Sequence, residues 1–201
     1  NFKGDTLVNA AGEFGTLAGT PAAFAANAAA QVNTSTVYSY SGDYLNYSMV
    51  LKGKKESAAE GDTVQSYTKY DVSAEQKMLY THNFKGGTLL GEALTSFTDA
   101  SVSTSVVYSY SGDYLDKSYT LRGLKTALPA GANTAAIQSF TQYDGSAEQK
   151  MNYTYNFKGD TLVNAAGEFG TLAGTPAAFV ANAAAQVSTS TVYNYSGDYL
   201  N

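Results

Sequence analysis

By size, the chain of 201 residues could form one or two globular domains. Only 14% of its residues are charged, against roughly 25% in an average soluble domain, so most of the polar surface must come from Ser, Thr, Asn and Gln. The net charge of −5 argues against nucleic acid as a partner, and the absence of Cys excludes disulfides, thiolate metal sites and thiol nucleophiles.

A long internal repeat dominates the sequence. Residues Asn1–Asn46 return as Asn156–Asn201, a shift of 155 positions. The copies differ at three places: Ala25 corresponds to Val180, Asn33 to Ser188, and Ser39 to Asn194. A fixed period is typical of repeat architectures. We therefore interpret 1–201 as one continuous array, in which 1–155 is one repeat and 156–201 starts the next. Since the chain begins with NFKGD inside a repeat, we expect it to belong to a longer polypeptide.

The first expected element is an Ala-rich tract near the start of each copy. Pro21–Gln31 reads PAAFAANAAAQ, with Pro at a favourable first helical position and many Ala residues, which have the highest helix propensity. This composition predicts a short helix that needs tertiary support at its length. Strand and loop remain alternatives, because small residues also pack closely in stacked sheets. No stretch of 18 apolar residues occurs, so no membrane-spanning segment is predicted.

A series of β-hairpins follows the Ala-rich tract. Each contains an aromatic or β-branched run, a polar turn, a second run and a closing Lys/Arg–Gly. The hairpins are expected at about 37–53, 66–86, 107–123 and 139–159, with a partial one at 192–201. A further strand is expected at Ser101–Val107, which is dense in Ser, Thr and Val. The second strand of the 66–86 hairpin is expected at Lys77–Lys85.

The turn residues give the hairpins their physical basis. Tyr38 and Tyr40 are two positions apart, so they should project from one face of a strand. Gly42 and Asp43 then interrupt the run: Gly tolerates a positive φ, and Asp bonds to nearby backbone. A single hairpin is marginal in water, so each should bury its aromatic face against its neighbours. The expected fold is all-β, with tandem hairpins stacked into an elongated rod, β-solenoid or spiral.

One pattern resembles a known family. The aromatic–x–x–Tyr–Asp sequences ending at Asp71 and Asp144, and the spacing of roughly one hairpin unit per 35 residues, are similar to those of tyrosine–aspartate (YD, or Rhs-type) repeats. That resemblance implies extended hairpins that spiral into shells or rods, mostly in large bacterial secreted or cell-surface proteins. The sequence departs from the family after Tyr–Asp, where a Gly–Arg–Leu turn is common but Ser146 and Ala147 follow Gly145. The departure favours a long uniform rod over a toxin-encapsulating shell.

The residues that carry the repeat motif are therefore structural candidates. They are Tyr38, Tyr40, Gly42, Asp43, Gly53, Tyr67, Tyr70, Asp71, Gly86, Tyr108, Tyr110, Gly112, Asp113, Gly123, Phe140, Tyr143, Asp144 and Gly159.

Catalytic, cofactor and metal sites are not predicted. His82 is the only histidine, has no evident catalytic partner, and corresponds to Tyr155 in the matching hairpin, so we interpret it as a packed strand residue. The Gly–Asp pairs could supply calcium ligands, but calcium takes six to eight oxygens and each Asp here stands nearly alone. Turn formation is the favoured interpretation of these Asp residues.

The sequence favours a structural function. We expect an extracellular or cell-surface filament or fibre of bacterial origin, in which near-identical units propagate and the chain's partner is itself. The first alternative is an adhesin or carbohydrate-binding stalk, in which exposed Tyr rings contact a ligand. The second is an Rhs-like shell around a toxin located elsewhere. An enzymatic function is not expected.

Overall fold

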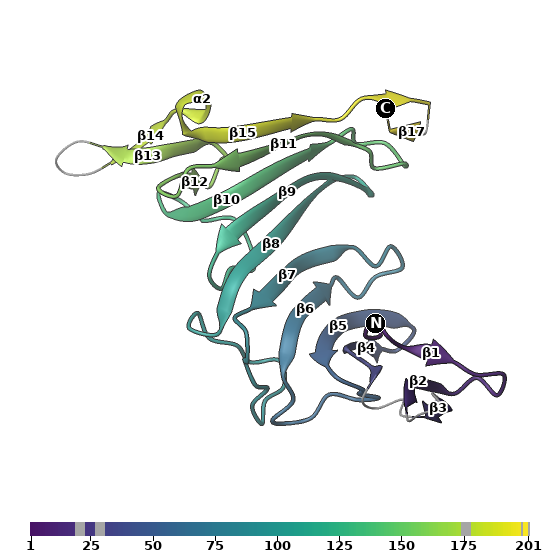
Figure 1. Cartoon of the computed structure of the whole chain (residues 1–201). Helices are drawn as coiled ribbons and strands as arrows, with labels where there is room; N and C mark the ends of the chain where they lie inside the picture. Colours follow the sequence, from purple (N-terminus) through teal and green to yellow (C-terminus); the bar gives the residue numbers. More distant parts are fainter. Residues whose placement is uncertain (19–22, 27–30, 174–177, 198, 201) are drawn as a thin grey trace.

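The fold is almost entirely β-sheet, which confirms the predicted all-β class. The computed structural model describes residues 1–18, 23–26, 31–173, 178–197 and 199–200 (Figure 1). The strands before the middle of the chain are β1 (Leu7–Val8), β2 (Phe14–Ala18), β3 (Ala23–Ala26), β4 (Thr34–Ser41), β5 (Tyr44–Lys52), β6 (Val64–Tyr70) and β7 (Met78–Phe84). The later elements are β8 (Val102–Ser111), β9 (Tyr114–Arg122), β10 (Thr134–Tyr143), β11 (Met151–Phe157), β12 (Leu162–Asn164), β13 (Phe169–Ala173), β14 (Ala178–Ala181), α2 (Ala183–Gln186), β15 (Val187–Val192), β16 (Tyr195–Ser196) and β17 (Tyr199–Leu200).

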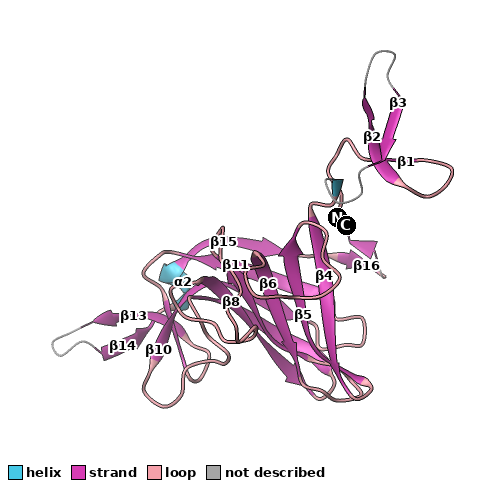
Figure 2. Cartoon of the chain, turned by 90° about the horizontal axis from the view of Figure 1, so that it is seen from below, coloured by secondary structure: helices cyan, strands magenta, loops and turns pink. Residues whose placement is uncertain are grey.

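Twelve of the described strands form one curved antiparallel sheet. Strands β4 to β11 pair in chain order, and β15 pairs with the free edge of β11. Three short strands, β12 to β14, extend the sheet from the first half of β10 (Figures 1 and 2). Figure 1 shows β4 and β15 at the two ends of this sheet. Over the described residues it does not close into a solenoid or rod, so these finer architectures stay predictions.

The main sheet contains the same four-strand unit twice. The first unit is β4–β7 and the second is β8–β11. Thr34 faces Lys52 in the first unit, and Thr104 faces Arg122 in the second, so the two hairpins share one register at a shift of 70 residues. The hairpins β6–β7 and β10–β11 match in the same way at a shift of 73 residues. The hairpins that are similar in sequence therefore also pair their strands in the same register.

The core lies on one face of the sheet, which we call the core face. One in-register row across six consecutive strands is buried throughout. Its members are Met49, Tyr67, His82, Ser105, Leu121 and Ile137. Because neighbouring residues on a strand point to opposite faces, this row identifies the core face for the whole sheet. Tyr67 and its counterpart Phe140 both lie there.

Segments that leave the sheet fold back over the core face. Over the first unit, Leu90 is buried and Leu94 and Phe97 pack against the same cluster. Over the second unit the cover is formed by β12 and β13, through Val163 and Phe169. The two hydrophobic clusters are therefore built alike, with a sheet floor and a covering segment. The hairpins join edge to edge within one sheet, and their aromatic faces are buried by these covers rather than by stacking on one another.

The opposite, outer face has no such cover among the described residues and is lined mainly by hydroxyl and Tyr side chains. Thr68 and Thr81 share a hydrogen bond of 2.9 Å across β6 and β7, and Thr141 and Thr154 repeat it at 2.9 Å across β10 and β11. Cross-strand Thr pairs of this kind add modest stability to a sheet. The exposed face is thus polar, as expected for a sheet with one solvated side.

The Ala-rich tract is divided between strand and helix. In the first copy Ala23–Ala26 is β3, while residues 21–22 and 27–30 of the predicted helix lie outside the described residues. In the second copy the corresponding tract contains β14 and the four-residue α2. A helix over the whole tract is therefore wrong. The reason lies in β2 and β13, whose backbone edges pair with the Ala-rich strands and satisfy their hydrogen bonds.

Candidate functional site: the repeated junction

The strongest candidate site is the junction that joins one hairpin pair to the next. At each junction a Phe that precedes Lys–Gly pairs with a Val at the start of the next hairpin. The three pairs are Phe2 with Val32, Phe84 with Val102, and Phe157 with Val187. The same main-chain pairing thus occurs three times: the segments after Phe2 and Phe157 are copies of one sequence, and the shorter segment after Phe84 differs from them in length and sequence.

A turn built on Lys–Gly–x–Thr closes each junction. Its Thr N–H donates to the Lys carbonyl, and the Lys N–H donates across the base of the covering segment. The Lys N–H bonds are Lys3 to Gln31 O at 2.8 Å, Lys85 to Ser101 O at 3.0 Å, and Lys158 to Gln186 O at 3.0 Å. These bonds hold the ends of each covering segment together and pair backbone groups that the turn would otherwise leave unsatisfied.

A pair of aromatic rings connects each junction to its cover. In every copy the junction Phe contacts a second Phe 12 or 13 residues later. The ring centroids are 4.3 Å apart for Phe2 and Phe14, 4.7 Å for Phe84 and Phe97, and 4.6 Å for Phe157 and Phe169. Separations of this size are those at which aromatic pairs gain stability beyond area burial. The pair therefore fixes the covering segment on the core face after Phe84 and Phe157, whereas the segment after Phe2 belongs to the separate sheet β1–β3.

At the other end of the strands, a lysine connects neighbouring hairpin tips. Lys77, after the β6–β7 turn, donates to the Gly112 carbonyl and to Asp113, both at 2.9 Å. Lys150 in the second unit donates to the Gly197 carbonyl at the same distance. Both ammonium groups also lie 5.7 Å from a Tyr ring, on Tyr110 and on Tyr195 respectively. The hydrogen bond to Asp113 raises the pKa of Lys77.

His82 lies in the buried row on β7, the last strand of the first unit and the strand that leads into the junction. It is 2% exposed and in contact with the rings of Tyr67, Tyr80 and Phe97. Ser105 Oγ donates to the Gly123 carbonyl at 2.7 Å, so it accepts from His82 Nδ1 at 2.9 Å. Burial lowers the pKa of His82 to about 4, which keeps the ring neutral at neutral pH. Its surroundings are those of a packed residue.

The predicted motif residues fall into two structural groups. Tyr67 and Phe140 belong to the core, whereas Tyr38 and Tyr40 are 56% and 61% exposed. On the outer face, Tyr108 shares a hydrogen bond of 3.3 Å with Thr81. Tyr70, Tyr110 and Tyr143 are half-buried. Burial raises the pKa of Tyr108, and the nearby Tyr143 and Tyr70 raise it further. The structure thus brings Tyr70, Tyr110 and Tyr143 close to Tyr108, whereas Tyr38 and Tyr40 lie on the edge strand β4.

The predicted Asp and Gly residues lie in turns. Asp71 accepts hydrogen bonds from the Ser73 and Lys77 backbones, and Asp144 does the same for Ser146 and Lys150. The Ser146 hydroxyl, followed by these backbone donors, lowers the pKa of Asp144. Gly42, Gly112, Gly53 and Gly123 have positive φ angles, whereas Gly86 and Gly159 do not. Asp43 and Asp113 are exposed at the hairpin tips.

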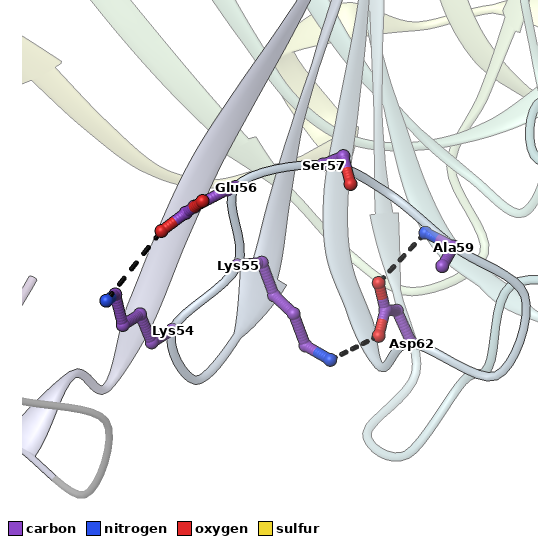
Figure 3. A pocket seen from close by; sticks show the side chains of 6 residues that line it. All are labelled: Lys54, Lys55, Glu56, Ser57, Ala59 and Asp62. Atoms are coloured by element: carbon purple, nitrogen blue, oxygen red, sulfur yellow. Dashed lines mark hydrogen bonds and ion pairs between the residues drawn. The ribbon is translucent and has the colours of Figure 1, made fainter.

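The loop from Lys54 to Asp62 forms a separate polar pocket of about 390 Å³ (Figure 3). Figure 3 shows Lys55 paired with Asp62, which also accepts from the Ala59 backbone at 2.9 Å, while Lys54 approaches Glu56 to 3.7 Å. The Lys55 hydrogen bond lowers the pKa of Asp62. Each charge in the pocket is therefore neutralised from within the loop.

The corresponding loop of the second unit also forms a pocket, but its lining is mostly apolar and includes Leu124, Leu128 and Pro129. A pocket recurs, but its chemistry does not, so the two loops do not form a repeated ligand site. Across the described ranges, His, Asp and Glu side chains nowhere gather in a group of three that could hold a metal ion. No helix in the described part of the chain is both long and apolar enough to cross a membrane.

No protein-family model, curated protein or solved structure matches this chain.

Sequence reasoning missed the residues that cover and anchor the junction. Phe97 and Phe169 could have been found from the recurrence of a second Phe 12 or 13 residues after each Phe–Lys–Gly. Ser35 and Ser105 are equivalent hydroxyls that bond the Gly53 and Gly123 carbonyls at 2.8 and 2.7 Å and hold the next loop in place. Their only sequence signal is a Ser in the same position of two similar hairpins.

Proposed function

We propose that this chain is a structural protein whose tandem repeats extend one β-sheet into a filament or fibre outside the cell or at its surface. The observation that carries the proposal is the recurrence of one junction at Phe2, Phe84 and Phe157 with the same strand pairing. A junction that forms around two different intervening segments allows units to be added without any new kind of contact.

Two further contacts support propagation along the sheet. The junction Phe contacts the second Phe of the segment that follows it in all three copies. The tip lysine bonds the next hairpin tip in both units, through Lys77 and Lys150. Both ends of the strands are therefore connected to the next unit by repeated contacts. In such a protein, stability is the sum of unit and interface terms, so it grows with the number of units.

The proposal predicts regular growth when repeats are added. We would prepare the 201-residue chain and two longer chains that carry one and two extra copies of residues 1–155 at the start. Small-angle scattering should show an equal increase in the largest dimension for each added copy. The denaturant m value should also rise by equal steps, because each copy buries the same area. Electron microscopy of the native material should show ordered fibres.

A control chain shows whether the added copy extends the sheet or only makes the polypeptide longer. In this control the added copy is joined through a long Gly/Ser linker, which keeps the two parts independent. It should unfold as two separate units, whereas the directly joined chain should unfold as one extended body. Growth into a rounder particle, or identical unfolding of the joined and linked chains, would rule out the fibre.

A second candidate function is adhesion, and the exposed Tyr residues favour it. Tyr38, Tyr40 and Tyr114 present rings to solvent, and such rings can stack on carbohydrate. A glycan array read with the native chain and with Tyr38→Ser/Tyr40→Ser tests this alternative. Ligand binding that disappears with the two rings would support an adhesin stalk.

A further inference from the structure

A polar pocket of about 470 Å³ opens at the junction end of the first unit. Its walls are the end of β5 with Lys52, the start of β6 with Gln65, and the turn after β7 from Lys85 to Gly87, all of them exposed. Strands β4 and β8 flank β5–β7 on the two sides (Figure 1). The pocket therefore has both of its neighbours in the sheet and does not arise at an end of the array.

The charge of this pocket is positive. Lys52 and Lys85 line it, and neither an Asp nor a Glu does. The Lys85 ammonium donates to the Ala100 carbonyl at 2.7 Å, which leaves its other N–H groups for a ligand. Over the described residues, neither lysine forms an ion pair. Two ammonium groups without a carboxylate, on a chain whose net charge is −5, favour an anionic ligand.

The turn after β7 contributes uncharged donors. The Thr88 N–H donates to the Lys85 carbonyl at 3.2 Å and closes the turn, whose central residues are Gly86 and Gly87. Within the ranges that the structure describes, the N–H groups of these two glycines have no acceptor. Backbone N–H groups in turns can bind anions, and the missing side chains leave these two accessible. Gln65 adds an amide that can both donate and accept.

The second unit carries a carboxylate in this turn that the first unit lacks. Gly87 corresponds to Asp160 in the second unit. Arg122 takes the place of Lys52 there, and it lies close to the turn, since a methyl group added at Gly159 would be 3.9 Å from its guanidinium. Both units thus place a cation of the preceding strand beside the turn, but the first unit has no Asp within it.

We propose that this pocket binds a uronic acid residue of an acidic polysaccharide. Lys52 and Lys85 hold the carboxylate, and Gln65 and the glycine N–H groups bond the oxygens of the sugar. The volume favours a sugar over a single inorganic anion, since small-molecule pockets measure about 300–1,000 Å³. The site lies within one unit of a single chain, so the proposal goes beyond the fibre function and does not depend on it.

Isothermal titration calorimetry of the full chain at low salt tests the proposal, with trigalacturonate as the ligand. The methyl ester of trigalacturonate has the same rings without the charge, and inorganic phosphate has a charge without the rings. Trigalacturonate should bind about tenfold or more tightly than either, because it alone engages the lysines and the sugar-binding groups together. Its affinity should fall as salt is added, since both lysines are exposed.

Three single substitutions locate the site. Lys52→Gln should weaken the binding of trigalacturonate about tenfold, through the loss of one charged hydrogen bond. Lys54→Gln is the matched control, because it removes a nearby lysine that pairs with Glu56 and lines a different pocket, so the affinity should not change. Gly87→Asp introduces the residue of the second unit and a carboxylate, so it should weaken binding at least as much as Lys52→Gln.

Lys52→Gln is the decisive variant, because the Lys52 side chain is exposed and has no partner among the described residues, so its replacement leaves the fold intact. Circular dichroism checks the fold of each variant. The proposal would be overturned if the native chain failed to bind trigalacturonate, or bound the methyl ester or phosphate equally well. It would also be overturned if Lys52→Gln bound trigalacturonate as tightly as the native chain.

Discussion

Replacing the buried His82 tests how the core of the first unit depends on pH. The ring is 2% exposed, and burial lowers its pKa to about 4 from an ordinary value near 6.5. At pH 7 it is mostly neutral in both the folded and unfolded chains and has little effect on stability. Below pH 6.5 the unfolded chain takes up a proton that the folded chain refuses until about pH 4. Stability should therefore fall over this range as pH falls.

The size of the loss follows from the difference between the two pKa values. Each unit of difference corresponds to about 1.4 kcal/mol, so the complete loss is about 3 kcal/mol between pH 6.5 and 4. Asp62 and Asp144 have lowered pKa values, so their stabilising effect is lost only as pH falls through the acidic range of Asp itself. Between pH 6.5 and 5, His82 should account for most of the change in the free energy of unfolding.

Two variants isolate this effect. His82→Tyr introduces the residue that stands at the equivalent position 155, and His82→Gln keeps a neutral polar group beside Ser105. Urea unfolding followed by circular dichroism at several pH values between 7.5 and 4.5 gives the free energy of unfolding for each chain. Both variants should lose about 2 kcal/mol less than the native chain by pH 5. Equal losses in all three chains would refute the assignment of this pH dependence to His82.

Three other predictions test the repeat by mutation. Leu51→Ala and Leu121→Ala should each cost about 2–5 kcal/mol in urea unfolding and differ little from one another, because both side chains are fully buried at equivalent positions. Ser105→Ala should cost about 1–3 kcal/mol, because it leaves buried hydrogen-bonding partners without their hydroxyl. Val72 has a φ of 58°, which a β-branched residue adopts only with strain, and Gly145 occupies the matching turn with a φ of 69°. Val72→Gly should therefore raise the melting temperature and Gly145→Val lower it, each by about 1 kcal/mol in stability.

The sequence was sufficient to predict the all-β class, because strand alternation and turn chemistry are local properties. Tyr38 and Tyr40 alternate with Ser, and the turn after them contains Gly42, whose φ of 61° no other residue adopts as easily. These signals depend only on neighbouring residues in the chain. They indicate where a strand begins, ends and turns, but not against what it packs.

The buried face could not be predicted in the same way. Tyr occurs on both faces: Tyr67 is in the core, whereas Tyr38 is exposed. The choice is made by distant residues, since Phe97 covers Tyr67 and no described segment covers Tyr38. Local alternation cannot distinguish these cases, because it shows that two side chains share a face without showing whether that face is covered.

The candidate site was missed for a related reason. Phe84 and Phe97 are separated by a loop without a regular hydrophobic period, so neither suggests a contact by itself. The contact becomes evident only when three copies are compared and a second Phe is found after each junction. Repetition thus supplies long-range information that a single copy of the unit does not contain.

The two copies of the first 46 residues also show which structural features follow from the segment's own sequence and which depend on the strands packed against it. β1–β3 and β12–β14 share one register, and Phe2 contacts Phe14 as Phe157 contacts Phe169. The local fold of this segment therefore does not depend on β10. Burial does depend on it, because Val8 is exposed and Val163 is not. A segment that is already folded before it meets its partner can be added to a growing sheet at small entropic cost, and a fibre built from repeats requires this property.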